Sequence, residues 1–161
     1  MINVNIASAT MMTKIILPKM ISKRKGAIIN LASSAALDPQ PLQQVYTATK
    51  AYMAFYSKAL ASEYSEYGIT VQTVSPMYVC TDMVAFSSAL NKASLFVPSP
   101  ETFTAQAIRT LGFSSSTTGF WSQGLQVTTM GLFSDFPIKI WISKKLNQMF
   151  RREALLSAKK S

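Results

Sequence analysis

The sequence contains no histidine and only one cysteine, Cys80. A chain with one thiol cannot form an internal disulfide, and this favours a reducing, intracellular compartment. Zinc and iron–sulfur sites take their ligands mostly from histidine and cysteine. We therefore predict no metal centre.

Glycine and long apolar runs are scarce as well. None of the six glycines stands in a G-x-G-x-x-G pattern, the turn that lets a backbone approach a dinucleotide pyrophosphate. No apolar run reaches the roughly 18 residues that span a bilayer, and no charged leader precedes an apolar block as in a signal peptide. We expect a chain that is soluble or lies on a surface.

The length and composition favour one globular domain, with 161 residues of which 48% are hydrophobic. The net charge is +9. Nucleic-acid binding is not predicted, because no nucleic-acid module is present and the aromatic residues do not interleave with the basic runs. The basic residues cluster at Lys23-Arg24-Lys25 and at the C-terminal end, where Lys139, Lys144, Lys145, Arg151, Arg152, Lys159 and Lys160 face Glu153 alone.

Two apolar strands joined by a long helix form the centre of the expected fold. Residues 27–32 are apolar except for Asn30, which is typical of a parallel strand covered on both faces. Residues 69–75 are rich in β-branched side chains and follow Gly68, the expected end of a helix over 44–67. This order predicts a right-handed βαβ unit with parallel strands.

Two more helices are expected around this unit. Apolar residues follow a helical period over 3–22, and Gly26 is the expected stop before the first strand. Ser99, a capping serine followed by proline, begins a helix that runs to about Leu111. Residues 35–44 contain two prolines and form a loop at the carboxyl end of the first strand, where open α/β sheets place ligands.

The stretch Tyr46-Thr47-Ala48-Thr49-Lys50 carries the most chemistry. On a helix Tyr46 and Lys50 lie one turn apart on the same face. A cation close to a tyrosine favours the phenolate and lowers the pKa of the phenol, which can then act as general acid toward a carbonyl oxygen. Ser33, thirteen residues before Tyr46, can hold that oxygen while it carries charge. A plain helix with an exposed tyrosine and lysine is the alternative.

Four segments in this order resemble the short-chain dehydrogenase/reductase family. They are Asn5, Asn30-Leu31-Ala32-Ser33, Tyr46-x-x-x-Lys50 and Pro76-Met77-Tyr78-Val79-Cys80-Thr81. The resemblance implies a catalytic tetrad of Asn5, Ser33, Tyr46 and Lys50, in which Asn5 orders a water that relays protons to Lys50. An asparagine that begins a helix is the alternative for Asn5.

The resemblance also implies the binding sites. The implied cofactor is NADP(H), held by Tyr46, Lys50, Pro76, Val79 and Thr81. Met77 stands where the family usually has glycine, which leaves the backbone path there open. Residues 82–98 correspond to the substrate-binding segment, although a mobile surface loop is the alternative. Its apolar wall, next to Ser33, would consist of Met83, Phe86, Leu90, Leu95 and Phe96.

Several runs are similar to the branch of the 17β-hydroxysteroid dehydrogenases and very-long-chain 3-oxoacyl-CoA reductases. In related hydroxysteroid dehydrogenase-like members, phenylalanine in place of the catalytic tyrosine is regarded as inactivating, whereas this chain keeps Tyr46. The resemblance implies an oxidoreductase that interconverts a ketone and a secondary alcohol on a steroid or long-chain acyl lipid, in the mitochondrion or the endoplasmic reticulum. The runs are Val97-Pro98-Ser99-Pro100, Thr110-Leu111-Gly112, 117–122 and Arg152-Glu153-Ala154-Leu155.

The implied fold class is α/β, the C-terminal half of a Rossmann-type doubly wound parallel sheet without the N-terminal glycine-rich βαβαβ half. Residues 1–136 would form the catalytic and substrate half. Without the first half, the helix N-terminus that binds the pyrophosphate is missing and the first strand exposes an apolar edge. We therefore expect little or no reductase activity from this chain alone. The alternative is a truncated, non-catalytic product that binds a partner or a membrane surface.

Two surfaces are candidates for such contacts. Residues 137–161 mix apolar and basic side chains, which predicts either a helix on an anionic membrane surface with Trp141 near the headgroups or a terminal helix that covers the core. Helices 3–22 and 44–67 are candidates for a homodimer contact, because family members often pair through them. Plain core packing is the alternative for the alanines that would allow that approach, at 48, 51, 54, 59 and 61.

Overall fold

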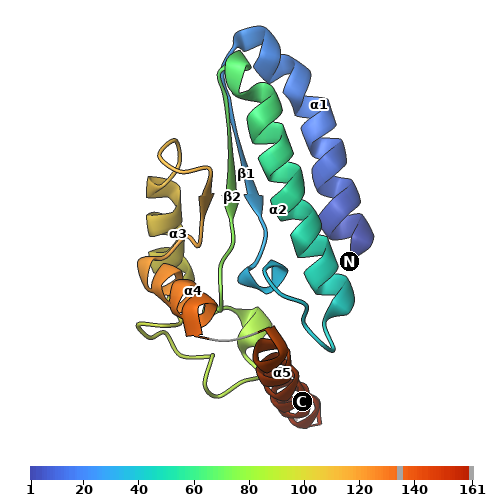
Figure 1. Ribbon diagram of the computed structural model, residues 1–161, viewed down its shortest axis with the longest axis vertical. Coiled ribbons are helices and arrows are strands. Elements are labelled where there is room, and N and C mark those ends of the chain that lie inside the picture. Colours follow the sequence, from blue (N-terminus) through green and yellow to red (C-terminus); the bar gives the residue numbers. More distant parts are fainter. Residues whose placement is uncertain (134–135, 160–161) are drawn as a thin grey trace.

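The computed structural model describes residues 1–133 and 136–159. Its sheet has three parallel strands in the order β1-β2-β3: β1 (Gly26–Leu31), β2 (Ile69–Val74) and β3 (Ser116–Thr117). The helices α1 (Ser8–Lys23) and α2 (Gln44–Tyr64) cover one face, and α3 (Pro100–Arg109) lies on the other (Figure 1). The predicted α/β fold with parallel strands is confirmed.

The carboxyl ends of β1 and β2 run together. The paired register extends from Gly26 opposite Ile69 to Leu31 opposite Val74. Beyond it, the Ala32 amide donates to the Val74 carbonyl at 2.8 Å, and the Ser34 amide donates to the Pro76 carbonyl at 2.9 Å. These bonds place the turn that contains Ser33 beside the segment that begins at Pro76.

Two apolar clusters lie on the two sides of the sheet. Ile28, Ile69 and Val71 pack against Leu17 of α1 and Leu60 of α2. On the other side, Val74 packs against Phe103 and Ala107 of α3 and against Phe120. The two strands therefore share the first cluster, but only β2 contributes to the second.

The prediction that the first strand is covered on both faces is wrong. Ile28 and Asn30 are buried toward α1 and α2, whereas Ile29 and Leu31 on the opposite face are 44% and 56% exposed. On this face the described apolar cluster consists of Val74, Phe103, Ala107 and Phe120, and no residue of β1 belongs to it. Within the described residues β1 also has only one neighbouring strand, so its outer edge is open.

The ends of the first two helices differ in one respect from the prediction. The first begins as a π-helical turn (Asn3–Ala7), continues as α1, and ends at Arg24 in the left-handed conformation, with φ of 48°. Gly26, the predicted stop, is instead the first residue of β1. Gly68 ends the second helix as predicted, because with φ of 69° a Cβ there would overlap with the carbonyl oxygen of Arg24.

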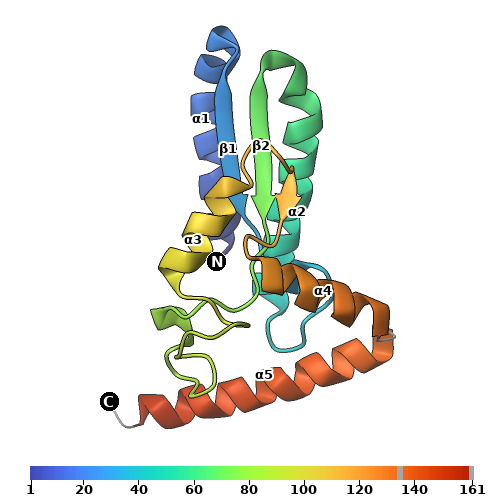
Figure 2. The same ribbon diagram turned by 90° about the vertical axis from the view of Figure 1, so that its left-hand side faces the viewer.

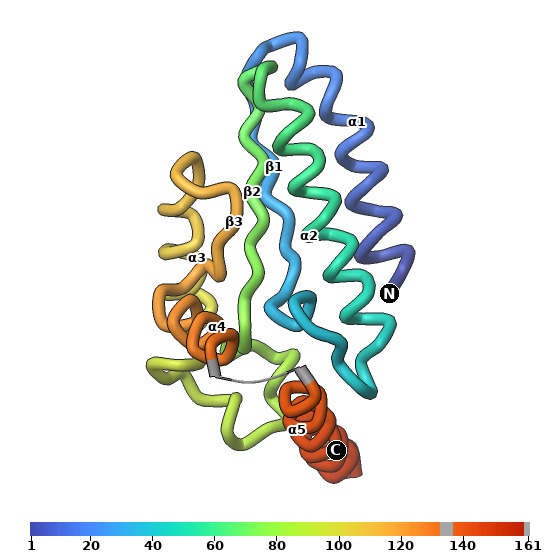
Figure 3. The backbone as a smooth tube through the Cα atoms, viewed as in Figure 1, coloured from blue at the N-terminus to red at the C-terminus, as the bar shows by residue number. Residues whose placement is uncertain are grey.

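Two helices complete the chain. α4 (Trp121–Phe133) and the two-residue β3, which lies beside β2 in Figure 3, were not predicted. α5 (Phe136–Ala158) matches the helix expected over 137–161, of which 160 and 161 lie outside the described residues. It crosses beyond the carboxyl ends of β1 and β2 (Figures 1 and 2). Across the described residues, no helix is both long and apolar enough to cross a membrane.

The outer sides of α1 and α2 carry apolar side chains exposed to solvent, among them Met11, Ile15 and Phe55. Of the five alanines of α2, Ala61 packs against the first apolar cluster, whereas Ala48 and Ala59 are exposed, so core packing explains only some of them. The side of α2 that does pack inward is made of Thr47, Thr49, Met53, Ser57 and Leu60. The homodimer contact through these two helices stays a prediction.

Candidate active site

Tyr46 and Lys50 lie on one face of α2, close to its N-terminus. The Lys50 Nζ is 5.8 Å from the centroid of the Tyr46 ring, over its face. The same Nζ donates a hydrogen bond of 2.9 Å to the carbonyl oxygen of Leu31, the last residue of β1. Lys50 therefore fixes the start of α2 to the carboxyl end of β1 and brings a cation to the tyrosine.

Lys50 is half-buried, and among residues 1–133 and 136–159 no carboxylate forms an ion pair with it. Burial lowers the pKa of its ammonium below the usual value of 10.5, because removing a charge from water disfavours the charged form. The Leu31 carbonyl takes one of three N–H donors. The others remain for groups that bind beside Tyr46.

Ser33 is buried at the turn after β1. Its Oγ accepts a hydrogen bond of 3.1 Å from the Ala35 amide and so caps the short 3-10 turn Ser34–Ala36. That bond uses a lone pair of the oxygen, so the hydroxyl hydrogen is available to an acceptor such as a carbonyl oxygen. The strand, its register with β2 and this turn together position the serine.

Asn5 contacts α2, the helix that carries Tyr46 and Lys50, from a distant part of the sequence. Its Nδ2 donates to the Thr49 Oγ1 at 2.9 Å, and that hydroxyl donates to the Tyr46 carbonyl at 2.7 Å. The alternative of a helix-capping asparagine is not supported, since no side chain caps this turn. Asn5 lies in a π-helical turn, a local geometry that is frequent at functional sites.

The backbone after β2 is held by a residue that the sequence reading missed, Gln123 of α4. Its Oε1 accepts from the Met77 amide at 3.0 Å, and its Nε2 donates to the Tyr78 carbonyl at 2.8 Å. Gln123 is completely buried. This double contact determines the backbone path at Met77, which the sequence had left open.

Tyr78 is a second functional candidate that was missed. Burial raises the pKa of its phenol above the ordinary value of 10.0, and the nearby Tyr46 raises it further. Its ring meets Phe150 of α5 edge to face, with centroids 5.6 Å apart. The signal was present in the sequence, because Tyr78 stands inside the quoted Pro76–Thr81 motif. A phenol that packs against α5 and interacts electrostatically with Tyr46 is a candidate for the same site.

The remaining predicted cofactor residues lie close to this segment. Val79 packs against the cluster of Val74 and Phe103, and the Cys80 amide donates to the Pro98 carbonyl at 2.9 Å. Thr81 is exposed. The backbone around Val79 is thus fixed, while the Thr81 side chain is open to solvent, and their roles toward a cofactor stay predictions.

The predicted substrate wall divides into two parts. Phe86 and Leu90 pack with Val84, Val97 and Phe150 in a third apolar cluster. Met83, Leu95 and Phe96 are exposed. The segment is irregular apart from the 3-10 turn Asp82–Val84. The structure therefore brings only part of the wall together, and contact with substrate stays a prediction for these residues.

α5 connects the two loops that border the site. Asn147, which is buried, accepts from the Gln43 Nε2 at 3.0 Å and donates to the Pro41 carbonyl at 2.9 Å, so it holds the loop in front of Tyr46. Phe150, one turn further, holds the segment after β2. No sequence pattern marks Asn147, because its partners lie over a hundred residues earlier in the chain.

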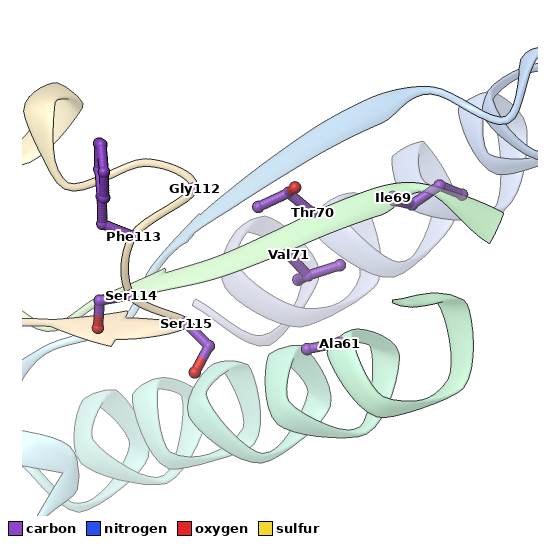
Figure 4. A pocket seen from close by; sticks show the side chains of 8 residues that line it. All are labelled: Ala61, Ile69, Thr70, Val71, Gly112, Phe113, Ser114 and Ser115. Atoms are coloured by element: carbon purple, nitrogen blue, oxygen red, sulfur yellow. The ribbon is translucent and has the colours of Figure 1, made fainter. Parts of the chain in front are cut away.

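A hollow of about 230 Å³ lies elsewhere, beside the first half of β2 (Figure 4). It is lined by Ile69, Val71, Phe113 and neighbouring residues, none of them charged. It exists because β3 pairs only with Thr73 and Val74 and leaves the start of β2 uncovered. Ser33 and Pro76 are at the other end of the strands, so the hollow is separate from the candidate site. No three potential metal ligands come together in the part of the chain that the structure describes.

Known proteins match the chain over most of its length. It is 43% identical over 155 residues to hydroxysteroid dehydrogenase-like protein 1 of Gallus gallus, covering 96% of this chain and 46% of that protein. It is 40% identical over 154 residues, with the same coverage, to the inactive hydroxysteroid dehydrogenase-like protein 1 of Homo sapiens. The human very-long-chain 3-oxoacyl-CoA reductase is 37% identical over 163 residues, covering all of this chain and 50% of the reductase. The chain thus spans about half the length of the curated relatives it matches.

Solved structures agree on the fold. A 7beta-hydroxysteroid dehydrogenase superposes with a TM-score of 0.77 at 21% identity, over 89% of this chain and 57% of that structure. A short-chain dehydrogenase from Sphingobium yanoikuyae in complex with NADPH superposes with a TM-score of 0.63 at 24% identity, over 83% and 55%. The sequence profile described as short chain dehydrogenase matches residues 1–91, which is more than half of the chain. This chain therefore belongs to the short-chain dehydrogenase family of oxidoreductases.

Proposed function

We propose that the chain is the catalytic part of an NADP(H)-dependent reductase that interconverts a ketone and a secondary alcohol on a steroid or long-chain acyl lipid. The observation that carries the proposal is the arrangement at the start of α2. The Lys50 ammonium lies over the Tyr46 ring and bonds to the end of β1, two residues before Ser33. Similarity to steroid dehydrogenase-like proteins and a 3-oxoacyl-CoA reductase supports the substrate class.

Each polar side chain has a role in moving or holding a proton. Tyr46 donates its phenolic proton to the carbonyl oxygen, and Lys50 stabilises the phenolate that results. The Ser33 hydroxyl donates to the same oxygen while charge develops on it. Asn5 orders a water that relays a proton to Lys50, and the bond that its amide donates to the Thr49 hydroxyl holds Asn5 against α2.

The residues present fit the nicotinamide end of the cofactor. Lys50 offers a half-buried ammonium for a ribose, and Gln123 fixes the backbone at Met77 and Tyr78 ahead of Val79 and Thr81. When bound, NADP(H) supplies the hydride. The pyrophosphate end is a different matter, since none of the six glycines forms a phosphate-binding turn. We therefore expect little or no turnover from the 161 residues by themselves.

A chimera tests the proposal. The half of the human very-long-chain 3-oxoacyl-CoA reductase that this chain does not match, which the resemblance implies is the N-terminal half, is joined to residues 1–161. NADPH oxidation is then measured with a 3-oxoacyl-CoA and with a steroid ketone. We expect turnover by the chimera, and a loss of about 10²–10⁴-fold in kcat for Tyr46→Phe with nearly unchanged cofactor affinity, because only the transferable proton is removed.

Tyr52→Phe is the matched control. Tyr52 lies on the same helix, but its hydroxyl pairs with Thr10 at 2.8 Å and its ring stacks on Tyr56, so its loss should leave kcat within about twofold. A chimera that binds NADPH but reduces neither ketone, or a Tyr46→Phe variant as active as Tyr52→Phe, would contradict the proposal. Strong NADPH oxidation by the unfused chain would contradict the incomplete cofactor site.

A further inference from the structure

α5 is attached to the rest of the molecule along one side. Asn147 and Phe150 are buried against the loops at the site, and Lys139 pairs with Asp38 at 3.8 Å. The helix contains 23 residues, so it is about 35 Å long, and Figure 2 shows it stretched across one end of the molecule. Its other side carries side chains exposed to solvent from Ile138 to Leu156.

That outer side carries a row of exposed apolar side chains. We define the apolar strip as Ile138, Ile142, Met149 and Leu156, all of which are exposed. Their spacing of four, seven and seven residues places them on one line along the helix, away from Asn147 and Phe150. None of them contributes to the apolar clusters of the described core.

Cations run parallel to the apolar strip. Lys145 and Arg152, seven residues apart, are exposed on its flank. The Lys145 ammonium lies 5.9 Å from the centroid of the Trp141 ring, and that ring is 62% exposed. Glu153 is the only acid within Phe136–Ala158. An apolar line, an exposed tryptophan and a row of cations on one face match the boundary between acyl chains and anionic headgroups.

We propose that α5 docks this protein on the surface of an anionic lipid bilayer. The apolar strip enters the boundary between headgroups and acyl chains, Trp141 lies at the headgroups, and Lys145 and Arg152 bind the lipid phosphates and carboxylates. A bilayer fits better than a second protein, because the cations follow the strip along its length and the one acid of Phe136–Ala158, Glu153, is only partly exposed. The inference stands independently of the proposed reaction.

The test measures binding of the whole chain to vesicles, without turnover. Trp121→Phe leaves Trp141 as the only tryptophan, so its fluorescence reports on α5. We expect co-sedimentation and a blue shift with vesicles of phosphatidylcholine and phosphatidylserine, and little of either with phosphatidylcholine alone. Raising the salt from about 0.1 M to about 0.5 M should release the protein, because screening weakens the attraction.

Two double variants, each of which removes two positive charges, test which side of α5 contacts the lipid. Lys145→Gln with Arg152→Gln removes the cations beside the apolar strip and should weaken vesicle binding about tenfold or more. Lys144→Gln with Arg151→Gln removes two exposed cations of identical spacing on another side of α5, and should change it about threefold or less. Ile142→Ser with Met149→Ser should abolish the blue shift. Circular dichroism checks that each variant is folded.

Three results would overturn the proposal. Equal losses in the two charge variants would mean that only net charge matters. Equal binding to neutral and anionic vesicles, or no binding, would exclude the anionic surface. A blue shift that needs no lipid and grows with protein concentration would mean that the apolar strip is a contact between protein chains. None of these results bears on the Tyr46 assay, so the two proposals fail separately.

Discussion

β1 and β2 are paired neighbours of six residues each, yet they are buried very differently. In β2 all residues except Thr70 are buried, whereas in β1 only Ile28 and Asn30 are. Both strands contribute to the apolar cluster with α1 and α2 on one face, but only Val74 of β2 contributes to the cluster with α3 and Phe120, and β3 pairs with the outer edge of β2. The strand with more polar residues, β2, is therefore the core strand, and the more apolar β1 is the half-open edge strand.

The two strands differ in which segments of the chain pack against them. β2 is covered by chain that directly follows it, through the segment from Ser75 to α3. On the other face of β1, Ile29 and Leu31 are apolar and exposed, and neither belongs to an apolar cluster of the described residues. A further layer of protein that packed on this face would bury them.

The largest difference in stability is expected between substitutions at Ile28 and Ile29, which are identical side chains on opposite faces of β1. Ile28→Ala should lower the free energy of unfolding by about 2–4 kcal/mol, because it leaves a cavity against Leu17, Leu60 and Val71. Ile29→Ala should cost about 1 kcal/mol or less in this chain. Urea unfolding of both variants measures the pair.

The same two substitutions, at Ile28 and Ile29, also test whether another layer of protein packs on the exposed face of β1. In the chimera with the N-terminal half of the reductase, Ile29→Ala should become about as costly as Ile28→Ala, because a new layer would bury it. A cost for Ile29 that is large already in the isolated chain would mean that this face is covered by the chain itself. A cost that stays small in the chimera would mean that the joined half does not pack there.

A smaller loss of stability is expected when the hydrogen bonds of a buried side-chain amide are removed. Gln72 of β2 donates to the carbonyls of Thr110 and Ser114, at 2.9 and 2.8 Å, and so holds α3 and the approach to β3. Gln72→Met keeps the volume but removes these donors, and should cost about 1–2 kcal/mol. Hydrogen exchange should accelerate at the amides of Thr73 and Ser75, which donate to Ser115 and Thr117.

The control for Gln72 lies on the other face. Asn30 of β1 donates to the Ser57 hydroxyl of α2 at 2.8 Å, so Ser57→Ala removes a bond between the strands and α2 only. It should destabilise by a similar amount, about 1–2 kcal/mol, without faster exchange at Thr73 and Ser75. If hydrogen exchange at Thr73 and Ser75 accelerates equally in both variants, the contacts on the two faces of β2 are not independent, which contradicts this prediction.

The sequence predicted the local features and missed the distant contacts. The βαβ unit follows from Gly68, the β-branched run and the helical period, which are properties of neighbouring residues. Tyr46, Lys50 and Ser33 could be predicted as candidates because their spacing in the sequence is short as well. Gln123 and Asn147 were missed, because an amide on a helix has no sequence signal for a partner 46 or 104 residues away. The two residues of β3 are too few for any period, and their pairing depends on β2.

The smallest expected effect is on the pH dependence of stability, to which Lys50 at the end of β1 and Tyr78 after β2 contribute in opposite directions. Lys50 at the end of β1 has a pKa lowered by burial, so below 10.5 the unfolded chain binds more protons and stability rises with pH toward that value. Tyr78 after β2 has a pKa raised by burial and by Tyr46, so above 10.0 the unfolded chain loses its proton first and stability falls. Lys50→Met should flatten the rise and Tyr78→Phe the fall, measured by urea unfolding across this range. If Tyr78→Phe leaves the fall above pH 10.0 unchanged, the phenol is not buried beside Tyr46.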